Sequence, residues 1–456
     1  MKIFSASTIS KYFVILAIIS IAVALTHPSA GAITLQEAKQ EALRVNLDIK
    51  IAREKVLEAQ SLRKERYAAM FASVGVFGNL SHKDIGPRVD VDMGEYGTYS
   101  GTGPIPSRDI EVLIGERDTY KVYLQLNQPI FTGGRLYYSY RQAGAREKGS
   151  EWERAQAVED VLFNTEWAYI SLLKAEEMKS LAEDHERTMQ AHMAAMELKY
   201  EKGRVALNDL LKVKAEVARA REEVIKADNA LVIARGQLNL LLNRPFDQPI
   251  EVVPVEAPDP LNSTLDEVEK IALANRLDLK YAHAQLEEFL YNRRVAESGY
   301  YPDFKFLAEY VRQTDQPTIE PENWSVMLLM EYPLWEWGRT GHKVSAARAV
   351  ERQGAYYIEA LKNRIAADVR QAWFGIKEAD TRIEVSREAL AQAEENLRIV
   401  RFGFDKGLKT STDVLEAEEL YSKTSKEYLQ ARYDAHLARA ALRHSMGLMR
   451  EEDIEF

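Results

Sequence analysis

Short segments of the chain alternate apolar and polar residues with a period of two. From Tyr120 to Leu126 the even positions are apolar, while Lys121 and Gln125 stand at odd positions. Because the side chains of a strand point alternately to opposite faces, this pattern predicts a strand with one apolar face. Other segments alternate in the same way, and we expect strands at 73–82, 119–131, 304–312 and 324–334.

Two interpretations of these strands stay open on the pattern alone. Strands of about 9 to 13 residues with one apolar face have the length needed to cross a bilayer as part of a barrel. An ordinary soluble hairpin, packed by its apolar face against helices, would show the same alternation.

Longer stretches follow the helical period instead. Large apolar residues recur every seven positions in one of them: Leu210, Val217, Val224, Leu231 and Leu238. Mostly smaller residues recur three positions later, so the seam has the 3.5-residue period of helices packed as a left-handed coiled coil. No proline interrupts residues 130–244 or 334–456. Helix interiors exclude proline because it costs about 3 kcal/mol there.

The helices predicted from this pattern alternate with the strands. We expect one helix ahead of the strand at 304, and others from Leu35 to about Ala69 and over 135–200, 207–243, 339–401 and 411–447. At 1.5 Å per residue the two longest would measure about 100 and 95 Å. Two of the shorter helices laid end to end would equal the length of one long helix beside them.

The sequence also repeats itself. Thr34–Ala38 returns as Thr264–Val268 at a spacing of 230, whereas Lys202-Gly203 returns as Lys406-Gly407 at a spacing of 204. The first half therefore carries 26 extra residues, which we place in a surface loop at 83–118. We expect two repeats of one architecture, at 33–246 and 263–456, joined by a linker at 247–262.

The first 32 residues are typical of an export signal. Lys2 and Lys11 precede an apolar stretch of 14 residues from Tyr12 to Leu25, and Ala30-Gly31-Ala32 offers small residues for cleavage. Such a stretch is too short to span a bilayer comfortably, so we expect a removed signal peptide at 1–32 rather than a membrane anchor. With no later run of 18 apolar residues, the exported chain would be periplasmic, secreted, or in the outer membrane as strands.

Composition and short motifs exclude several classes of function. The formal net charge of −10 argues against a nucleic-acid partner. The lack of cysteine excludes disulfides, thiolate metal sites and cysteine nucleophiles. Neither Gly-x-Ser-x-Gly nor His-Glu-x-x-His occurs, so we expect neither an enzyme nor a cofactor. Met189, His192, Met193 and Met196 share one helix face, but methionines at helical spacing are usually packing residues, and we expect no metal site.

The order and spacing of these segments resemble the TolC-like outer-membrane efflux proteins. The resemblance rests on the duplicated architecture, on Gln128–Phe131 followed by Gly133-Gly134-Arg135, and on the turns at 200–209 and 404–413. It implies a mixed, mainly α fold, in which a long coiled-coil α-helical barrel continues a transmembrane β-barrel. Each chain of a trimer would give four strands in two structural repeats. Four strands cannot close a barrel whereas eight or twelve can, and only the likeness selects the trimer.

The resemblance also implies a function. Such a channel-tunnel lies in the cell outer membrane, extends into the periplasm and is a passive exit duct for substrates. The partners implied are the other copies of a homotrimer, a periplasmic adaptor (membrane fusion) protein, an inner-membrane pump and outer-membrane lipid. The cargo stays open between drugs, metals and exported proteins. The alternative is a soluble periplasmic coiled-coil scaffold or adaptor protein, whose strands would form an ordinary soluble sheet.

Two tight turns are the adaptor-docking tips that the resemblance implies. The residues concerned are Gly203, Arg204, Val205 and Asp209 in the first turn and Gly407, Leu408, Ser411 and Asp413 in the second. The second turn matches the family pattern well. In the first turn, Arg204 stands where the family usually has an apolar residue, and Ala206 stands where it usually has a hydroxyl residue. The two turns are therefore not expected to bind an adaptor equally. Glycine and aspartate there also have a purely structural interpretation, as residues that cap helix ends.

The second turn also carries the expected gate. Asp413 and Glu416 lie three positions apart on one helix face, so three chains would place six carboxylates around a narrow mouth. The resemblance implies an acidic pore constriction there and puts Phe404 and Lys409 where bonds to neighbouring helices hold the tip shut. Because the first repeat has Lys212 in place of Glu416, we expect the ring in one repeat only. The other interpretation is that both carboxylates face outward and keep the helix soluble.

Overall fold

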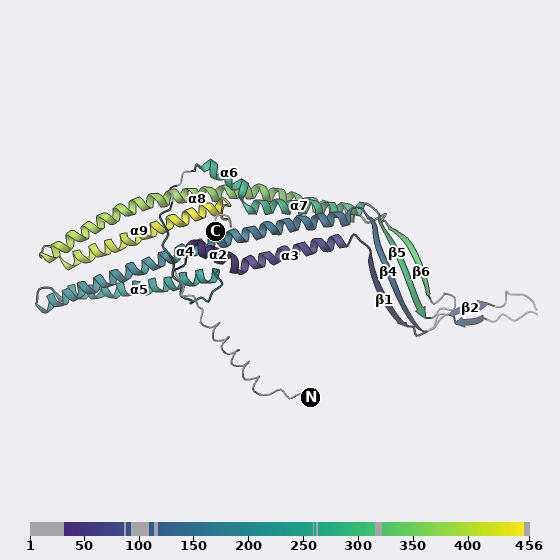
Figure 1. Cartoon of the computed structure of the whole chain (residues 1–456), viewed down its shortest axis with the longest axis horizontal. Coiled ribbons are helices and arrows are strands. Elements are labelled where there is room, and N and C mark those ends of the chain that lie inside the picture. Colours follow the sequence, from purple (N-terminus) through teal and green to yellow (C-terminus); the bar gives the residue numbers. More distant parts are fainter. Residues whose placement is uncertain are drawn as a thin grey trace, which may run out of the picture. The chain divides into compact units, whose positions relative to one another are not determined.

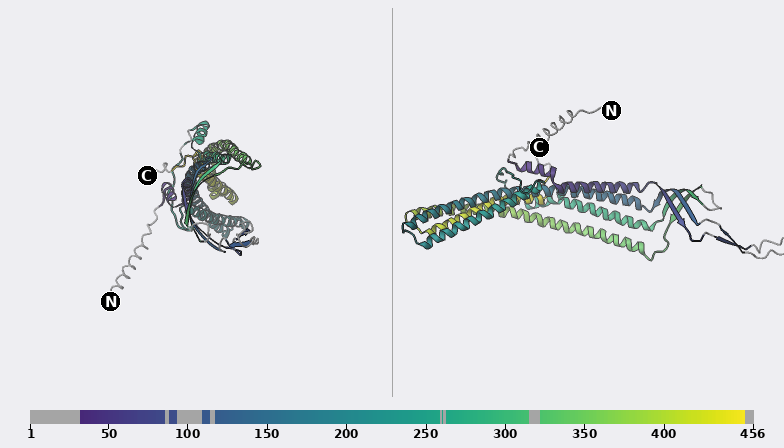
Figure 2. Two further views of the ribbon diagram at one scale, coloured as in Figure 1. Left: turned by 90° about the vertical axis from the view of Figure 1, so that its right-hand side faces the viewer. Right: turned by 90° about the horizontal axis from the view of Figure 1, so that it is seen from below.

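The computed structural model describes residues 32–85, 88–92, 109–113, 117–258, 260, 263–314 and 322–450. The expected signal peptide, apart from its last residue, lies outside these residues. The chain divides into two compact units, whose elements are drawn in Figures 1 and 2. The helical unit comprises Met1–Glu54, Trp152–Leu279 and Ala360–Phe456, and the sheet unit comprises Lys55–Glu151 and Lys280–Glu359.

Helices fill the described part of the helical unit. Its elements are α2 (Leu35–Val45), α5 (Leu207–Leu241), α6 (Leu265–Asn275), α9 (Ser411–Ser445) and the larger parts of α4 (Arg135–Glu201) and α8 (Arg339–Asp405). Alanine, leucine, glutamate, lysine and arginine fill these helices, and all of them favour the helical conformation. One tight turn joins α4 to α5 and another joins α8 to α9 (Figure 1).

The single helix expected from Leu35 to about Ala69 is instead two helices, α2 and α3 (Leu47–Ala68). The break falls at Asn46, whose backbone has an extended ψ of 136°. Its Oδ1 accepts a hydrogen bond from the Asp48 N–H at 2.8 Å, and its Nδ2 donates to the Leu241 carbonyl at 3.1 Å. The side chain thus caps the start of α3, and this local bonding overrides the helical period of the sequence.

The core of the helical unit surrounds Tyr169 of α4. Its fully buried ring packs in one cluster with Leu238 of α5 and Leu437 of α9. The hydroxyl accepts a hydrogen bond from the Val253 N–H at 2.9 Å and lies 2.8 Å from the Ile33 carbonyl oxygen. Burial raises the pKa of Tyr169 to about 12. One buried phenol therefore ties the segment before α2 to the segment after α5.

A four-stranded antiparallel sheet dominates the described part of the sheet unit. Its strands are β1 (Ser73–His82), β4 (Asp118–Thr132), β5 (Asp303–Thr314) and β6 (Glu322–Glu331), in the order β1-β4-β5-β6. Figures 1 and 2 show them side by side in one curved sheet. The two central strands come from opposite halves of the sequence. Most of α3 and α7 (Leu277–Glu297) belongs to the same unit, as do the first turns of α4 and α8.

The segment 83–118 is more than the surface loop that the sequence analysis expects. Within it, β2 (Arg88–Asp92) and β3 (Asp109–Leu113) pair antiparallel as a separate two-stranded ribbon. Their sequences, Arg-Val-Asp-Val-Asp and Asp-Ile-Glu-Val-Leu, place β-branched residues at every second position. That alternation favours strands although the surroundings are hydrophilic, so the expectation of a plain loop is corrected here.

A glycine pair joins β4 to α4. Gly133 has φ of +58° and Gly134 has φ of +84°, in the left-handed region that favours glycine. A Cβ atom added at Gly133 would lie 2.6 Å from the Ser298 carbonyl oxygen and 2.8 Å from Tyr301 Cβ. The junction therefore needs glycine both for its backbone angle and for its close approach to η2 (Ser298–Tyr300).

Replacing Gly133 by alanine is expected to destabilise the sheet unit by about 2 kcal/mol or more, because it adds backbone strain to a steric clash. The measurement is the midpoint of thermal unfolding of the purified protein in detergent, followed by circular dichroism. Gly78→Ala on β1 is the matched control, since a Cβ atom there meets nothing within 4 Å. Equal midpoints for the two variants would contradict this account of the junction.

Candidate functional site

One face of the four-stranded sheet carries exposed apolar side chains. The register places Val76, Leu124, Tyr310 and Trp324 in one row across all four strands. Val76 is 72% exposed and Trp324 is 74% exposed. Exposed side chains that continue the same face include Val74, Val122, Val326, Leu328 and Met330. A contiguous apolar surface of this kind is unfavourable in water and favours contact with another apolar phase.

The opposite face of the sheet is more polar. Lys121 of β4 forms an ion pair with Glu309 of β5, with 3.5 Å between Nζ and Oε1. The same ammonium lies 5.0 Å from the ring centre of Tyr123. Gln125 and Asn127 continue this face along β4. The sheet thus has one apolar face and one more polar face, as the period-two alternation predicts. Exposed Phe77, Met327 and Leu329 lie among the polar side chains of the second face.

Strands β1 and β6 are the two edges of this sheet. Within the described residues β1 pairs only with β4, and β6 pairs only with β5. The N–H and C=O groups along such an edge favour pairing with another strand. Because neighbours in the sheet alternate in direction, β1 and β6 run antiparallel to each other. The β1 edge of one copy therefore matches the β6 edge of another in the same antiparallel pattern.

The first expected docking tip, between α4 and α5, begins with a glycine cap. Gly203 has φ of +68°, and its N–H donates to the Tyr200 carbonyl at 2.8 Å. The Arg204 N–H donates to the Lys199 carbonyl at 2.9 Å. These two bonds satisfy carbonyl groups that the end of α4 would leave unpaired.

Some of the remaining residues of this tip are exposed to solvent and others are buried. Arg204 is exposed, whereas Val205 is half-buried against a cluster that contains Met196 and Leu210. Ala206 precedes α5 without a side-chain bond to the helix, and Asp209 stands in its first turn. A carboxylate in the first turn of a helix interacts favourably with the helix dipole.

The second expected docking tip, between α8 and α9, has a similar glycine cap and a stronger helix start. Gly407 has φ of +74°, and the exposed Leu408 donates its N–H to the Gly403 carbonyl at 2.8 Å. Asp413 and Thr410 form a capping box: the Asp413 carboxylate accepts from the Thr410 N–H at 2.7 Å, and Thr410 Oγ1 accepts from the Asp413 N–H at 3.2 Å. The bond from the Thr410 backbone lowers the pKa of Asp413.

Capping limits what Asp413 can contribute to an acidic constriction. Its Oδ2 is engaged by both the N–H and the hydroxyl of Thr410. Glu416, one turn further along α9, is exposed. Lys409 is also exposed, and its side chain passes over Gly403, where an added Cβ atom would lie 2.7 Å from Lys409 Cγ. Of the two expected gate carboxylates, Glu416 is therefore the one that faces solvent without a capping role.

Phe404 links the two helical hairpins. Its half-buried ring packs against Val400 and Val414 of its own hairpin and against a cluster around Met196 in the other. Lys199 Nζ of α4 lies 3.6 Å from the ring centre, a distance at which the cation is attracted to the face of the ring. The end of α8 is therefore held to α4 by apolar packing and by a cation–π contact.

Two further bonds join the hairpins at this end, and sequence reasoning missed both. His192 Nε2 of α4 lies 3.1 Å from Ser411 Oγ, and Lys212 Nζ of α5 donates to Thr412 Oγ1 at 3.4 Å. Burial lowers the pKa of His192, which favours the neutral imidazole. The partners lie 219 and 200 positions apart in the sequence. No local pattern in the sequence marks such pairs.

Those methionines are packing residues. Met189 and Met196 are fully buried. In the part of the chain that the structure describes, no three His, Asp or Glu side chains are grouped closely enough to hold a metal ion.

Among the described helices, none combines the length and the apolar character needed to cross a membrane.

Known proteins share the sequence pattern and the fold. The sequence profile of the family described as outer membrane efflux protein matches residues 38–244 and 269–448. Outer membrane protein TolC of Escherichia coli (strain K12) is 21% identical over 354 residues, 73% of this chain and 70% of that protein. The proteases secretion protein PrtF of Dickeya chrysanthemi is 19% identical over 345 residues, 74% of each chain.

A solved structure agrees with the family match. The outer membrane protein VceC of Vibrio cholerae superposes with a TM-score of 0.72 at 18% identity, covering 91% of this chain and 96% of that one. At this identity the superposition shows a shared fold, while the family profile spans most of both halves of the sequence. The chain therefore belongs to the outer membrane efflux protein family, and its location is the outer membrane.

Proposed function

We propose that the chain is a channel-tunnel that acts as a passive exit duct and is built from three copies. The observation that carries the proposal is the sheet with one exposed apolar face and two edges, β1 and β6, that pair with no further strand among the described residues. Four strands do not close a barrel, whereas three copies supply twelve. The antiparallel relation of β1 and β6 lets each copy continue the sheet of the next. The apolar face then contacts lipid and the polar face lines the lumen.

We infer that the two halves of the chain, 33–246 and 263–456, are structural repeats. Each half gives two strands to the sheet, a helix of 67 residues and a helix of 35 residues. In each half a glycine-capped turn joins the two helices. Three copies would bring six such hairpins together as an α-helical barrel that extends the duct into the periplasm. The coiled-coil seam along α5 supports this packing.

The two turns are the proposed docking sites for a periplasmic adaptor protein, which would connect the duct to an inner-membrane pump. Leu408 supports this role at the second turn, because a large apolar side chain that is 79% exposed favours a protein partner. Gly407 is exposed beside Leu408, whereas Ser411 is buried and lies 3.1 Å from His192 Nε2, so we expect Ser411 to support the turn rather than to contact the adaptor. At the first turn the exposed Arg204 offers charge instead, so we expect weaker or different contacts there.

The proposed gate is a ring of carboxylates at the second turn. Glu416 is its main member, and Asp413 contributes the carboxylate oxygen that Thr410 does not bind. Phe404 and Lys409 would hold the turn against its neighbours in the closed state. The pump rather than the duct would supply the energy of transport, so no catalytic residue is assigned. Small toxic molecules and exported proteins both remain candidate cargo.

Replacing Glu416 by glutamine is expected to lower the preference of the pore for cations several-fold, because a ring of like charges attracts counter-ions. The measurement is the reversal potential of the protein in a planar bilayer under a gradient of potassium chloride. Glu222→Gln, which removes the same charge from an exposed position on α5, is the control. If both variants keep the selectivity of the parent protein, the constriction lies elsewhere.

Planar bilayers also test the duct itself. The purified protein should insert in discrete steps, each giving a stable ion conductance. Protein that enters the bilayer but stays electrically silent, both as the parent chain and as variants designed to loosen the second turn, would exclude a continuous pore.

A further inference from the structure

A groove near the end of α9 is separate from the surfaces described above. It has a volume of about 930 Å³ and lies within the helical unit, between α2, α4, α8, α9 and the segment before α6. One part of its wall is apolar and includes Leu162, Ile376, Leu442 and Met446. The other part is polar and holds several basic side chains. A mixed wall of this kind suits an occupant that is itself both apolar and charged.

The polar part of the wall carries excess positive charge, because its basic side chains Lys39, Arg439, Arg443 and Arg450 outnumber the carboxylates of Glu166 and Glu256. Lys39 Nζ lies 2.7 Å from a Glu166 carboxylate oxygen, and Arg443 pairs with the same carboxylate. One negative charge therefore serves two cations. Burial, together with the nearby Arg439, lowers the pKa of His436, which lines the same wall. The electrostatic field in the groove thus favours an anionic occupant.

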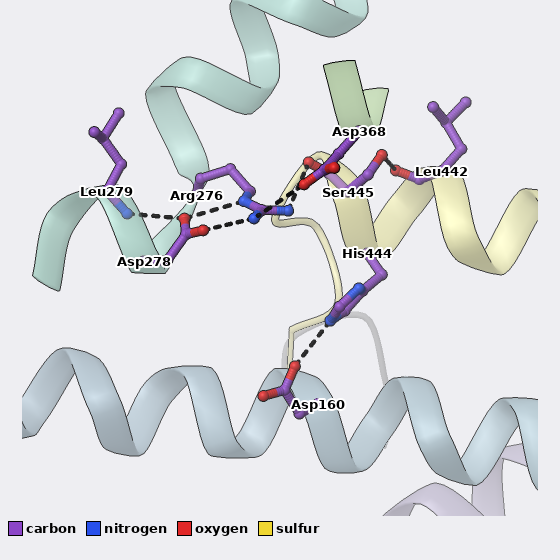
Figure 3. A network of polar contacts seen from close by, with 8 residues as sticks. All are labelled: Asp160, Arg276, Asp278, Leu279, Asp368, Leu442, His444 and Ser445. Carbon is purple, nitrogen blue, oxygen red and sulfur yellow. Dashed lines mark hydrogen bonds and ion pairs between the residues drawn. The ribbon is translucent and has the colours of Figure 1, made fainter. Parts of the chain in front are cut away.

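The last turn of α9 is fixed beside this groove, and Figure 3 shows the contacts that hold it. His444 Nε2 lies 2.9 Å from an Asp160 carboxylate oxygen. The Arg276 guanidinium donates to the Ser445 carbonyl at 3.4 Å and is itself held by Asp278 at 3.0 Å. Contacts from α4 and from Arg276, which lies between α6 and α7, therefore position the end of α9.

The residues after α9 continue this anchoring. Gly447 has φ of +71°, and a Cβ atom there would lie 3.0 Å from the Arg276 backbone nitrogen. The Met449 N–H donates to a Glu159 carboxylate oxygen at 3.2 Å. Arg450, which lines the groove, donates to Asn275 Oδ1 at 2.5 Å. The chain is thus held in place up to the wall of the groove.

The six residues that follow Arg450 have the composition that the groove favours. They are Glu451, Glu452, Asp453, Ile454, Glu455 and Phe456. Four carboxylates match the basic part of the wall, and two large apolar side chains match the rest. We propose that this segment binds in the groove of its own chain, with its carboxylates toward Lys39 and Arg443 and with Ile454 and Phe456 against the apolar wall.

Reach and tethering support this occupant. Six extended residues span about 20 Å, enough to cross a groove of this volume from its edge at Arg450. Because the segment is joined to the wall, its effective concentration is in the millimolar range. Even weak contacts then keep the groove filled, whereas an untethered anionic peptide would need far higher affinity to compete.

Disulfide trapping tests the proposal directly, because the chain has no cysteine of its own. Asp453→Cys is combined with Gln36→Cys in the groove wall, and in the control with Gln237→Cys, an exposed residue of α5 that does not line the groove. After mild oxidation of the intact protein, we expect about tenfold more intrachain disulfide in the groove pair, as preferential residence there raises the local thiol concentration.

Reversing the charge of the segment distinguishes specific binding in the groove from random collision of the two cysteines. Adding Glu451→Lys, Glu452→Lys and Glu455→Lys to the groove pair should reduce its disulfide to the level of the control pair, with unchanged circular dichroism. Equal trapping in the two pairs, or trapping that survives the three lysines, would overturn the proposal. Disulfides formed only between chains would overturn it as well, since the segment would then occupy the groove of a second copy.

Discussion

The variant Leu124→Arg is expected to be almost absent from the outer membrane. Leu124 lies in the apolar row of the sheet, between Val76 and Tyr310 on the neighbouring strands. An arginine on the lipid face of a barrel costs about 2 to 4 kcal/mol near the middle of the bilayer, and a trimer would contain three of them. The measurement is the amount of folded protein in the outer-membrane fraction, followed by an epitope tag.

The adjacent position supplies the control. Gln125→Arg introduces the same side chain one residue away, on the polar face of β4, where a charge can be hydrated within a lumen. We expect this variant to reach the outer membrane at close to the parent level. If Gln125→Arg fails and Leu124→Arg assembles, the two faces of the sheet are assigned the wrong way round.

The second large effect is expected at the link between the helical hairpins. Phe404→Ala removes the ring that packs in both clusters and lies 3.6 Å from Lys199 Nζ. Because large-to-small changes at fully buried aromatic residues cost about 3 to 5 kcal/mol, we expect roughly half of that for this half-buried ring. A closed tip held partly by Phe404 should loosen, and the single-channel conductance in planar bilayers should rise.

Phe402→Ala serves as the matched comparison for this variant. It deletes the same side chain two residues earlier on α8, where the ring is 62% exposed. We expect its conductance to stay near that of the parent protein. A rise of equal size in both variants would show that a general weakening of α8, rather than the contact with α4, opens the tip.

Period-two alternation explains why the strands were predictable from sequence. Expected strands at 73–82 and 119–131 correspond to β1 (Ser73–His82) and β4 (Asp118–Thr132). Each side chain of these strands faces either an apolar or a polar environment, so the pattern records the environment directly. The glycines at the two turns were also informative, because positive φ angles leave little choice of residue.

Other features depend on contacts that the sequence does not mark. Asn46 interrupts a helical pattern by capping α3 through the Asp48 N–H, and its side chain is also held by the Leu241 carbonyl, 195 positions away. Lys199 and His192 of α4 both contact the Phe404 ring from the other half of the sequence, and neither residue belongs to a sequence motif. The sequence is compatible with Asp413 either as a gate residue or as a helix cap. The bonds from Thr410 show that capping occupies one of its carboxylate oxygens.

The stoichiometry of the native protein tests the central claim most directly. The protein is extracted from outer membranes in mild detergent, and its mass is measured by native mass spectrometry after the detergent is removed. The account predicts a complex of three chains, because three sheets of four strands close one barrel. A protein that is a single chain or a pair under these conditions, in a state that still conducts ions, would contradict it.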